Sequence, residues 1–194
     1  GLGDVYKRQL LITTMSSNSA GWAKGGSWRL SDLDPETLAQ EAMDKAITGR
    51  DPHQVKPGPY SVVLDHYAVD DILEALSLYG MGAQAVQDGR SWMNELLGTQ
   101  AMPSSVTIWD DGSDTSGWPV PFDAEGVPRQ RVDIIADGTV ANPVHNSYTA
   151  GKDGVSSTGH QSYFTGPPIA SNLFMREGDT SLEKMIASTQ RGLY

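Results

Sequence analysis

Apolar side chains recur every three or four residues in two stretches of the chain, and this spacing predicts two helices. The first covers residues 34–47, where an Asp-Pro pair supplies the N-cap and the first helical position. The second covers residues 68–79 and is followed by glycines. A third helix is expected to begin at Thr180, because Glu183 three residues later would complete a capping box.

Short β-branched and aromatic runs predict strands between these helices. A buried strand is expected over residues 60–64, and others over 105–109 and 171–175. The run 131–140 predicts a hairpin, because Asp137-Gly138 is a strong turn signal. Polar, glycine-containing segments are read as loops, namely residues 13–31, 110–121 and 149–166.

This order of elements predicts an α+β fold with helices first, a mainly antiparallel β domain after them, and a C-terminal helix. Residues 1–9 fit no element, and we expect residues 1–21 to be a non-native or disordered leader. The apolar pair Leu193-Tyr194 looks like the start of a further strand, so truncation is expected at both ends.

Charge and composition narrow the range of partners. The 194 residues hold 14 Lys+Arg and 24 Asp+Glu, a net charge of −10, which argues against nucleic acid and anionic membrane surfaces as partners. The chain has no cysteine, so thiol chemistry and disulfides are excluded within it. No apolar run is long enough to span a bilayer, and a cytoplasmic location is expected.

Metal-binding patterns are weak in this sequence. The four histidines, at positions 53, 66, 145 and 160, form no paired zinc motif. Asp110, Asp111 and Asp114 could offer oxygen ligands to calcium, but Gly112 stands where a second ligand belongs, so an acidic turn is the better interpretation.

Nucleophilic and acid–base patterns are equally weak. Asp123 and Glu125 are close in sequence, but an acid–base pair cannot be argued from proximity alone. Thr158 and the two serines before it lie in a glycine-flanked loop beside His160, which by itself does not make a triad.

Several stretches together carry a family resemblance, and they extend in a consistent order over residues 22–194. They are the helix around Leu38–Ile47 with Pro57–Leu64 after it, Val106–Gly112, Pro121–Arg131, Ile134–Gly138, Ser157–His160, Met175–Gly178, Glu183–Ile186 and Arg191–Tyr194. In order and spacing, this set resembles the TldD/PmbA family of zinc metallopeptidase-related proteins. The resemblance implies that residues 22–56 end the family's N-terminal domain and that 57–194 are an incomplete C-terminal domain.

The same resemblance bears on catalysis. TldD-type members carry an HExxxH motif on a helix and a later cysteine, which together bind zinc, whereas PmbA-type (TldE) members lack the motif. Counted from the strand at 60–64, the motif positions hold Glu74, Ala75 and Tyr79. The resemblance therefore implies a PmbA-type subunit with no catalytic residue and no metal of its own, with zinc in a TldD-type partner.

The resemblance also implies a role in cleaving unfolded or leader peptides within a heterodimer or higher assembly. Capture of an extended peptide as a β-strand is the expected mode of binding. The residues expected to contact peptide lie in two loops, and they are Asp123, Glu125, Gly126, Ser157, Thr158, Gly159 and His160.

Two alternatives remain open. The protein could itself be a metallopeptidase, with a divergent site that combines His66, Asp70 and Glu74 with the C-terminal part expected after Tyr194. It could also be a peptide-binding or scaffold protein with no link to proteolysis.

Overall fold

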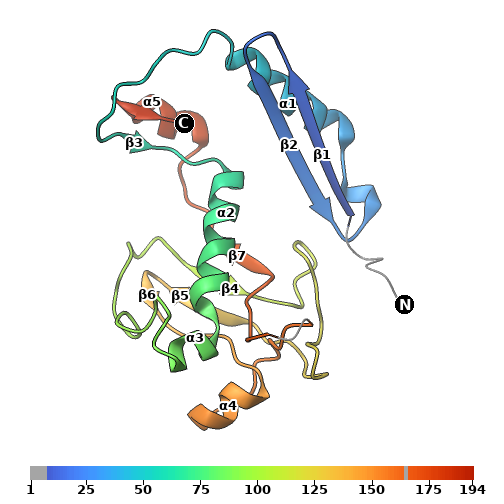
Figure 1. Ribbon diagram of the computed structural model, residues 1–194, viewed down its shortest axis with the longest axis vertical. Coiled ribbons are helices and arrows are strands. Elements are labelled where there is room, and N and C mark those ends of the chain that lie inside the picture. The colour runs from blue at the N-terminus through green and yellow to red at the C-terminus, as the bar shows by residue number, and fades with distance from the viewer. Residues whose placement is uncertain (1–7, 164–165) are drawn as a thin grey trace. The chain divides into compact units, whose positions relative to one another are not determined.

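The computed structural model describes residues 8–163 and 166–194, so residues 1–7 of the expected leader lie outside it. The chain combines helices and antiparallel sheets, which confirms the predicted α+β class (Figure 1). It divides into two compact units, residues 1–59 and residues 60–194. In the described part of the chain, no helix is long and apolar enough to cross a membrane.

The first unit is a β-hairpin with one long helix packed on it (Figure 1). Strands β1 (Arg8–Met15) and β2 (Ala20–Ser27) pair antiparallel over their whole length. The loop predicted over residues 13–31 is therefore wrong for most of its length. Residues 8–21 of the expected leader belong to this hairpin.

Small residues in β2 mislead the sequence interpretation because they serve helix packing. A Cβ atom on Gly21 would collide with the backbone of the following helix at Ala42 and Ala46. The Thr14 hydroxyl of β1 donates to the Ala42 carbonyl over 2.7 Å. A composition rich in Gly and Ser is typical of a loop. In this hairpin it instead allows a helix to lie directly on a strand.

Helix α1 (Pro35–Thr48) follows the short 3-10 helix η1 (Leu30–Asp32). One carboxylate oxygen of Asp34 accepts hydrogen bonds from the amides of Glu36 and Thr37, as expected of an N-cap. The helix ends at Gly49. The prediction of this helix is confirmed at both ends.

The second unit is built on a four-stranded antiparallel sheet with the strand order β6-β5-β4-β7. The strands are β4 (Ile108–Asp110), β5 (Val132–Ala136), β6 (Thr139–Val140) and β7 (Leu173–Met175). Asp137 and Gly138 both have positive φ in the two-residue turn between β5 and β6. The predicted hairpin is thus confirmed with its turn.

Helices and a small parallel strand pair complete this unit. The helices are α2 (His66–Leu76), the π-helical turn η2 (Ser77–Met81), α3 (Ala83–Gln87), α4 (Ser147–Asp153) and α5 (Leu182–Ser188). Strand β3 (Ser61–Val62) pairs with β8 (Gly192–Leu193), so Leu193 is part of a strand as expected.

Three predictions need correction in this unit. Helix α4 occupies part of the loop predicted over 149–166, and it is stabilised by a capping box between Asn146 and Thr149. Strand β3 is exposed rather than buried. Helix α5 has Ser181 as its N-cap in place of Thr180, because the Ser181 hydroxyl accepts the amide of Lys184.

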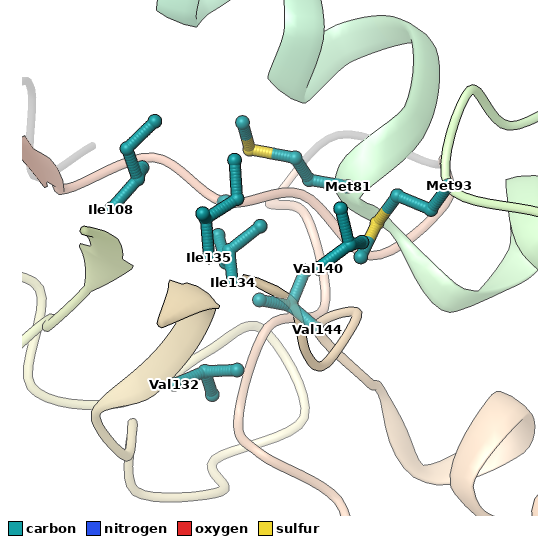
Figure 2. Close-up of a cluster of buried hydrophobic side chains, with 9 residues drawn as sticks. Met81, Met93, Ile108, Val132, Ile134, Ile135, Val140 and Val144 are labelled. Atoms are coloured by element: carbon teal, nitrogen blue, oxygen red, sulfur yellow. The ribbon is translucent and has the colours of Figure 1, made fainter. Parts of the chain in front are cut away.

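The hydrophobic core of the second unit lies between the sheet and the chain around η2. Met81 and Met93 are fully buried, and Figure 2 shows Met81 beside Ile135 of β5 and Met93 beside Val140 of β6. Leu73 and Leu76 of α2 pack against this cluster from its edge. The core therefore anchors the end of α2 that runs into the π-helical turn.

Candidate functional site

The positions matched to the catalytic motif lie where α2 passes into η2. Asp65 caps the start of α2 by accepting the Ala68 amide over 3.0 Å. Glu74 and Ala75 are exposed on the last turn of the helix. Tyr79 follows in the π-helical turn, and 75 % of its surface is exposed.

The π-helical turn is held firmly on its inner side. Ser77 donates to the Ala170 carbonyl over 2.5 Å, and Ser91 donates to the Gly80 carbonyl over 2.6 Å. Gly80 lies directly against Trp92, with no room for a Cβ atom. These contacts bury Ser77, Gly80 and Met81 and leave the two residues between them, Leu78 and Tyr79, facing outward.

These residues do not fit a zinc ion. Ala75 has no donor atom, and of the three motif positions only Glu74 carries a carboxylate. Across residues 8–163 and 166–194, no three His, Asp or Glu side chains gather as a metal site would require. His66 and Glu74 are eight residues apart on one helix, about 12 Å along its axis, so these two side chains do not meet at one metal ion within α2. The divergent metallopeptidase stays an untested alternative.

A buried polar network forms the second feature of interest, at the end of β4. Asp110 is fully buried, and one of its carboxylate oxygens accepts the amides of Ser171 and Asn172 over 2.6 and 2.7 Å. Its other oxygen lies 2.9 Å from Nε2 of His160, which is also fully buried, and 3.8 Å from the Arg129 guanidinium. Asp110 thereby joins three segments that are far apart in sequence.

The electrostatics of this network favour an ionised carboxylate. Burial alone would raise the pKa of Asp110, but the hydrogen bond and charge of His160, the Asn172 amide and the Arg129 charge outweigh it and lower the pKa below its ordinary value. An ionised carboxylate only accepts hydrogen bonds, so Nε2 of His160 is the donor.

The network includes an arrangement that looks like a catalytic triad. Thr158 Oγ1 lies 2.9 Å from Nδ1 of His160, whose Nε2 faces Asp110. However, the same Thr158 oxygen also accepts the His145 amide over 2.7 Å and lies 3.1 Å from the His145 carbonyl. A hydroxyl with three protein partners beside a fully buried histidine has a structural role, since a nucleophile must face its substrate.

The two loops expected to contact peptide are brought together. Asp123 is buried and its carboxylate accepts the amides of Glu125, Val127 and Gln161. Gly159 has a φ of 74° and lies against the Pro128 carbonyl with no room for a Cβ atom. The loops are therefore tied to one another mainly by buried polar contacts.

The remaining predicted residues in these loops also have structural contacts. Gly126 has a φ of 79° in the turn that Asp123 organises. The Glu125 carboxylate accepts the amide of Ser147 at the start of α4 over 2.9 Å, and the Ser157 hydroxyl accepts the Gly159 amide. Their contact with peptide stays a prediction.

The calcium interpretation receives no geometric support. Asp110 points into the buried network, whereas Asp111 accepts the amide and hydroxyl of Ser113, and Asp114 does the same for Ser116. The three carboxylates face different partners. The acidic-turn interpretation matches these contacts.

The sequence did not predict several residues of this polar network. Arg129 donates to the Ser171 hydroxyl over 2.6 Å, and the Asn172 side chain bonds to the Asp111 carbonyl and the Trp118 amide. His145 is buried, and this burial lowers the pKa of its ring. Single polar residues in loops carry no local signal of such pairing, because their partners are up to 62 residues away.

The sequence is similar to a known protein domain family and to curated metalloproteases. Residues 57–194 match the PmbA/TldA metallopeptidase C-terminal domain. A metalloprotease of Methanocaldococcus jannaschii is 26 % identical over 161 residues, covering 81 % of this chain and 36 % of the relative. Metalloprotease PmbA of Escherichia coli O157:H7 is 29 % identical over 138 residues, covering 68 % of this chain and 29 % of the relative.

The fold of the chain is also similar to that of solved structures. A Thermotoga maritima protein described as a candidate modulator of a DNA gyrase matches with a TM-score of 0.85 and 27 % identity, over 96 % of this chain and 44 % of that one. TldE from Thermococcus kodakarensis shares the fold with a TM-score of 0.73 at 20 % identity, over 96 % of this chain and 44 % of that one. This chain thus spans less than half the length of the relatives and structures it matches, and it belongs to the TldD/PmbA metallopeptidase-related family.

Proposed function

We propose that this protein is a non-catalytic partner subunit of a TldD/TldE-type zinc metallopeptidase that acts on unfolded or leader peptides. The observation that carries the proposal is that these 194 residues hold no HExxxH, and the resemblance assigns Glu74, Ala75 and Tyr79 to the motif positions. A carboxylate, a methyl group and a phenol cannot replace two imidazole ligands and a general base. The family membership supplies the link to peptide cleavage.

The geometry around α2 supports a binding role better than a catalytic one. The side chains at the motif positions are exposed on an element that is fixed from behind by Ser77, Ser91 and Trp92. The two loops around Asp123 and His160 are pinned in the same way. Exposed motif positions on a fixed helix, together with loops held rigid by buried hydrogen bonds, suit a subunit that holds peptide while its TldD-type partner supplies zinc. A cytoplasmic location is part of this proposal.

The zinc content of the purified protein tests the proposal directly. We expect well below one zinc per chain after dialysis against zinc-containing buffer, measured by atomic absorption. A TldD-type relative with HExxxH, handled in the same way, is the positive control. One tightly bound zinc per chain would contradict a non-catalytic role and would favour the divergent metallopeptidase.

A further inference from the structure

An outward-facing surface on α2 and η2 combines apolar and acidic side chains. We call it the α2 face and define it by Asp71, Ile72, Glu74, Leu78 and Tyr79. At 100° per residue the three positions in α2 fall within an arc of about 160° on one side of the helix, and Leu78 and Tyr79 follow in the π-helical turn. The exposed fractions of the three large side chains are 47 % for Ile72, 54 % for Leu78 and 75 % for Tyr79.

The opposite side of the same helix is where the packing lies. Leu73 and Leu76 contact the hydrophobic core, and the Leu76 carbonyl accepts a hydrogen bond from the Trp92 indole over 3.0 Å. The apolar residues of the α2 face therefore do not pack in the hydrophobic core. Because the π-helical turn is anchored at both ends, Leu78 and Tyr79 are presented without a large entropic cost on binding.

The charged residues of α2 and of the chain directly around it in sequence have one sign. No Lys or Arg occurs between Lys56 and Arg90, whereas Asp65, Asp70, Asp71 and Glu74 all lie on or at the start of α2. The imbalance extends over the whole second unit: residues 60–194 hold 7 Lys+Arg and 17 Asp+Glu, and residues 1–59 hold seven of each. The surface potential of this unit therefore attracts cations.

Building on the proposed function, we infer that the α2 face binds a cationic peptide segment that also carries apolar side chains. Lysine or arginine side chains of the peptide would pair with Asp71 and Glu74, and its apolar side chains would cover Ile72 and Leu78. The ring of Tyr79 offers a cation–π surface to the same basic side chains. The peptides handled by the enzyme would accordingly be enriched in basic residues.

Binding of three labelled ten-residue peptides to the protein, measured by fluorescence anisotropy, tests this inference. The peptides alternate Lys with Leu, Glu with Leu, and Lys with Ser, so that charge and apolar content vary separately. We expect the Lys-Leu peptide to bind at least about tenfold more tightly than either of the others, and its affinity to fall as salt is raised from 0.05 to 0.5 M.

Two sets of variants locate the binding site. The double variant Asp71→Asn/Glu74→Gln should weaken Lys-Leu binding by about three- to tenfold, and Tyr79→Ser by a similar factor. The matched control is Glu177→Gln/Asp179→Asn, which removes two exposed charges from the segment between β7 and α5. We expect it to bind the peptide like the unaltered protein, and circular dichroism should show all three variants folded.

Three outcomes would overturn the inference. Equal affinity for the Lys-Leu and Glu-Leu peptides would exclude a cationic ligand. If the control variant weakened Lys-Leu binding equally, the effect would come from the net charge of the protein and not from the α2 face. Loss of assembly with a TldD-type subunit in the Asp71→Asn/Glu74→Gln variant, with peptide binding unchanged, would make the α2 face a subunit interface.

Hydrolysis of uncharged peptides by the assembled pair would continue if only this inference failed, and would be absent if the proposed function failed.

Discussion

The His160 ring donates a hydrogen bond from Nε2 to the Asp110 carboxylate over 2.9 Å, and both side chains are fully buried although 50 residues separate them. The bond ties the end of β4 to the loop that contains Ser157 and Gly159. Because Asp110 also accepts two amides at the start of β7, one carboxylate aligns two neighbouring strands and a loop.

Removal of the Asp110 charge should destabilise the second unit strongly. Asp110→Asn leaves the buried Arg129 guanidinium without its nearest carboxylate, and breaking a buried pair costs about 3–5 kcal/mol. Urea unfolding followed by tryptophan fluorescence measures this loss. Asp133→Asn is the control, because its pair with Arg131 is half exposed and should contribute less than about 1 kcal/mol. Equal losses in both variants would contradict the role given to Asp110.

The same carboxylate should dominate the response to acid. Since the folded state lowers the pKa of Asp110, the unfolded state takes up a proton first as the pH falls. Its contribution to stability is complete above about pH 4 and is lost as the pH falls through the lower folded pKa. We therefore expect the stability of Asp110→Asn to change less than that of the unaltered protein below about pH 4. Parallel pH curves for the two proteins would contradict this assignment.

His145 should add a second pH dependence at higher pH. Its burial lowers the pKa of the ring, so the folded state favours the neutral form. The unfolded chain protonates first as the pH falls below about 6.5, and stability declines from there until the folded ring is protonated as well. In His145→Gln this decline should be smaller, as measured by urea midpoints between pH 7.5 and 5. An unchanged decline would show that another group causes it.

The close approach of α1 to the hairpin predicts a sharp glycine effect. Gly21→Val places a side chain where the backbone of α1 lies, and we expect a loss of about 1–3 kcal/mol in the first unit. Gly151→Ala in α4 is the matched control, because nothing lies within 4 Å of its added Cβ, and it should be neutral or slightly stabilising. Thermal unfolding by circular dichroism distinguishes the two. Tolerance of valine at position 21 would mean that α1 does not pack on β2 as described.

Local chemistry explains which elements the sequence predicts well. The Asp34-Pro35 start of α1 and the Asp137-Gly138 turn are determined by neighbouring residues, and both occur as expected. Strand β2 was missed because its small residues make sense only once α1 is in contact with them. Strand β1 was missed because its residues were assigned to the expected leader and loop. The resemblance assigns the motif positions, which stay a prediction, whereas the outward turn of Tyr79 depends on Ala170 and Ser91, which touch η2 from distant parts of the chain. The Asp110–His160 pair is equally non-local.

Peptide hydrolysis by reconstituted subunits tests the central claim most directly. The protein and a TldD-type relative with an intact HExxxH motif are purified separately and together, and each sample receives the same unfolded peptide. We predict cleavage by the pair, none by this protein alone, and loss of cleavage when the glutamate of the partner's motif is changed to glutamine. Cleavage by this protein alone would contradict the account and would require a catalytic site that Glu74, Ala75 and Tyr79 do not provide.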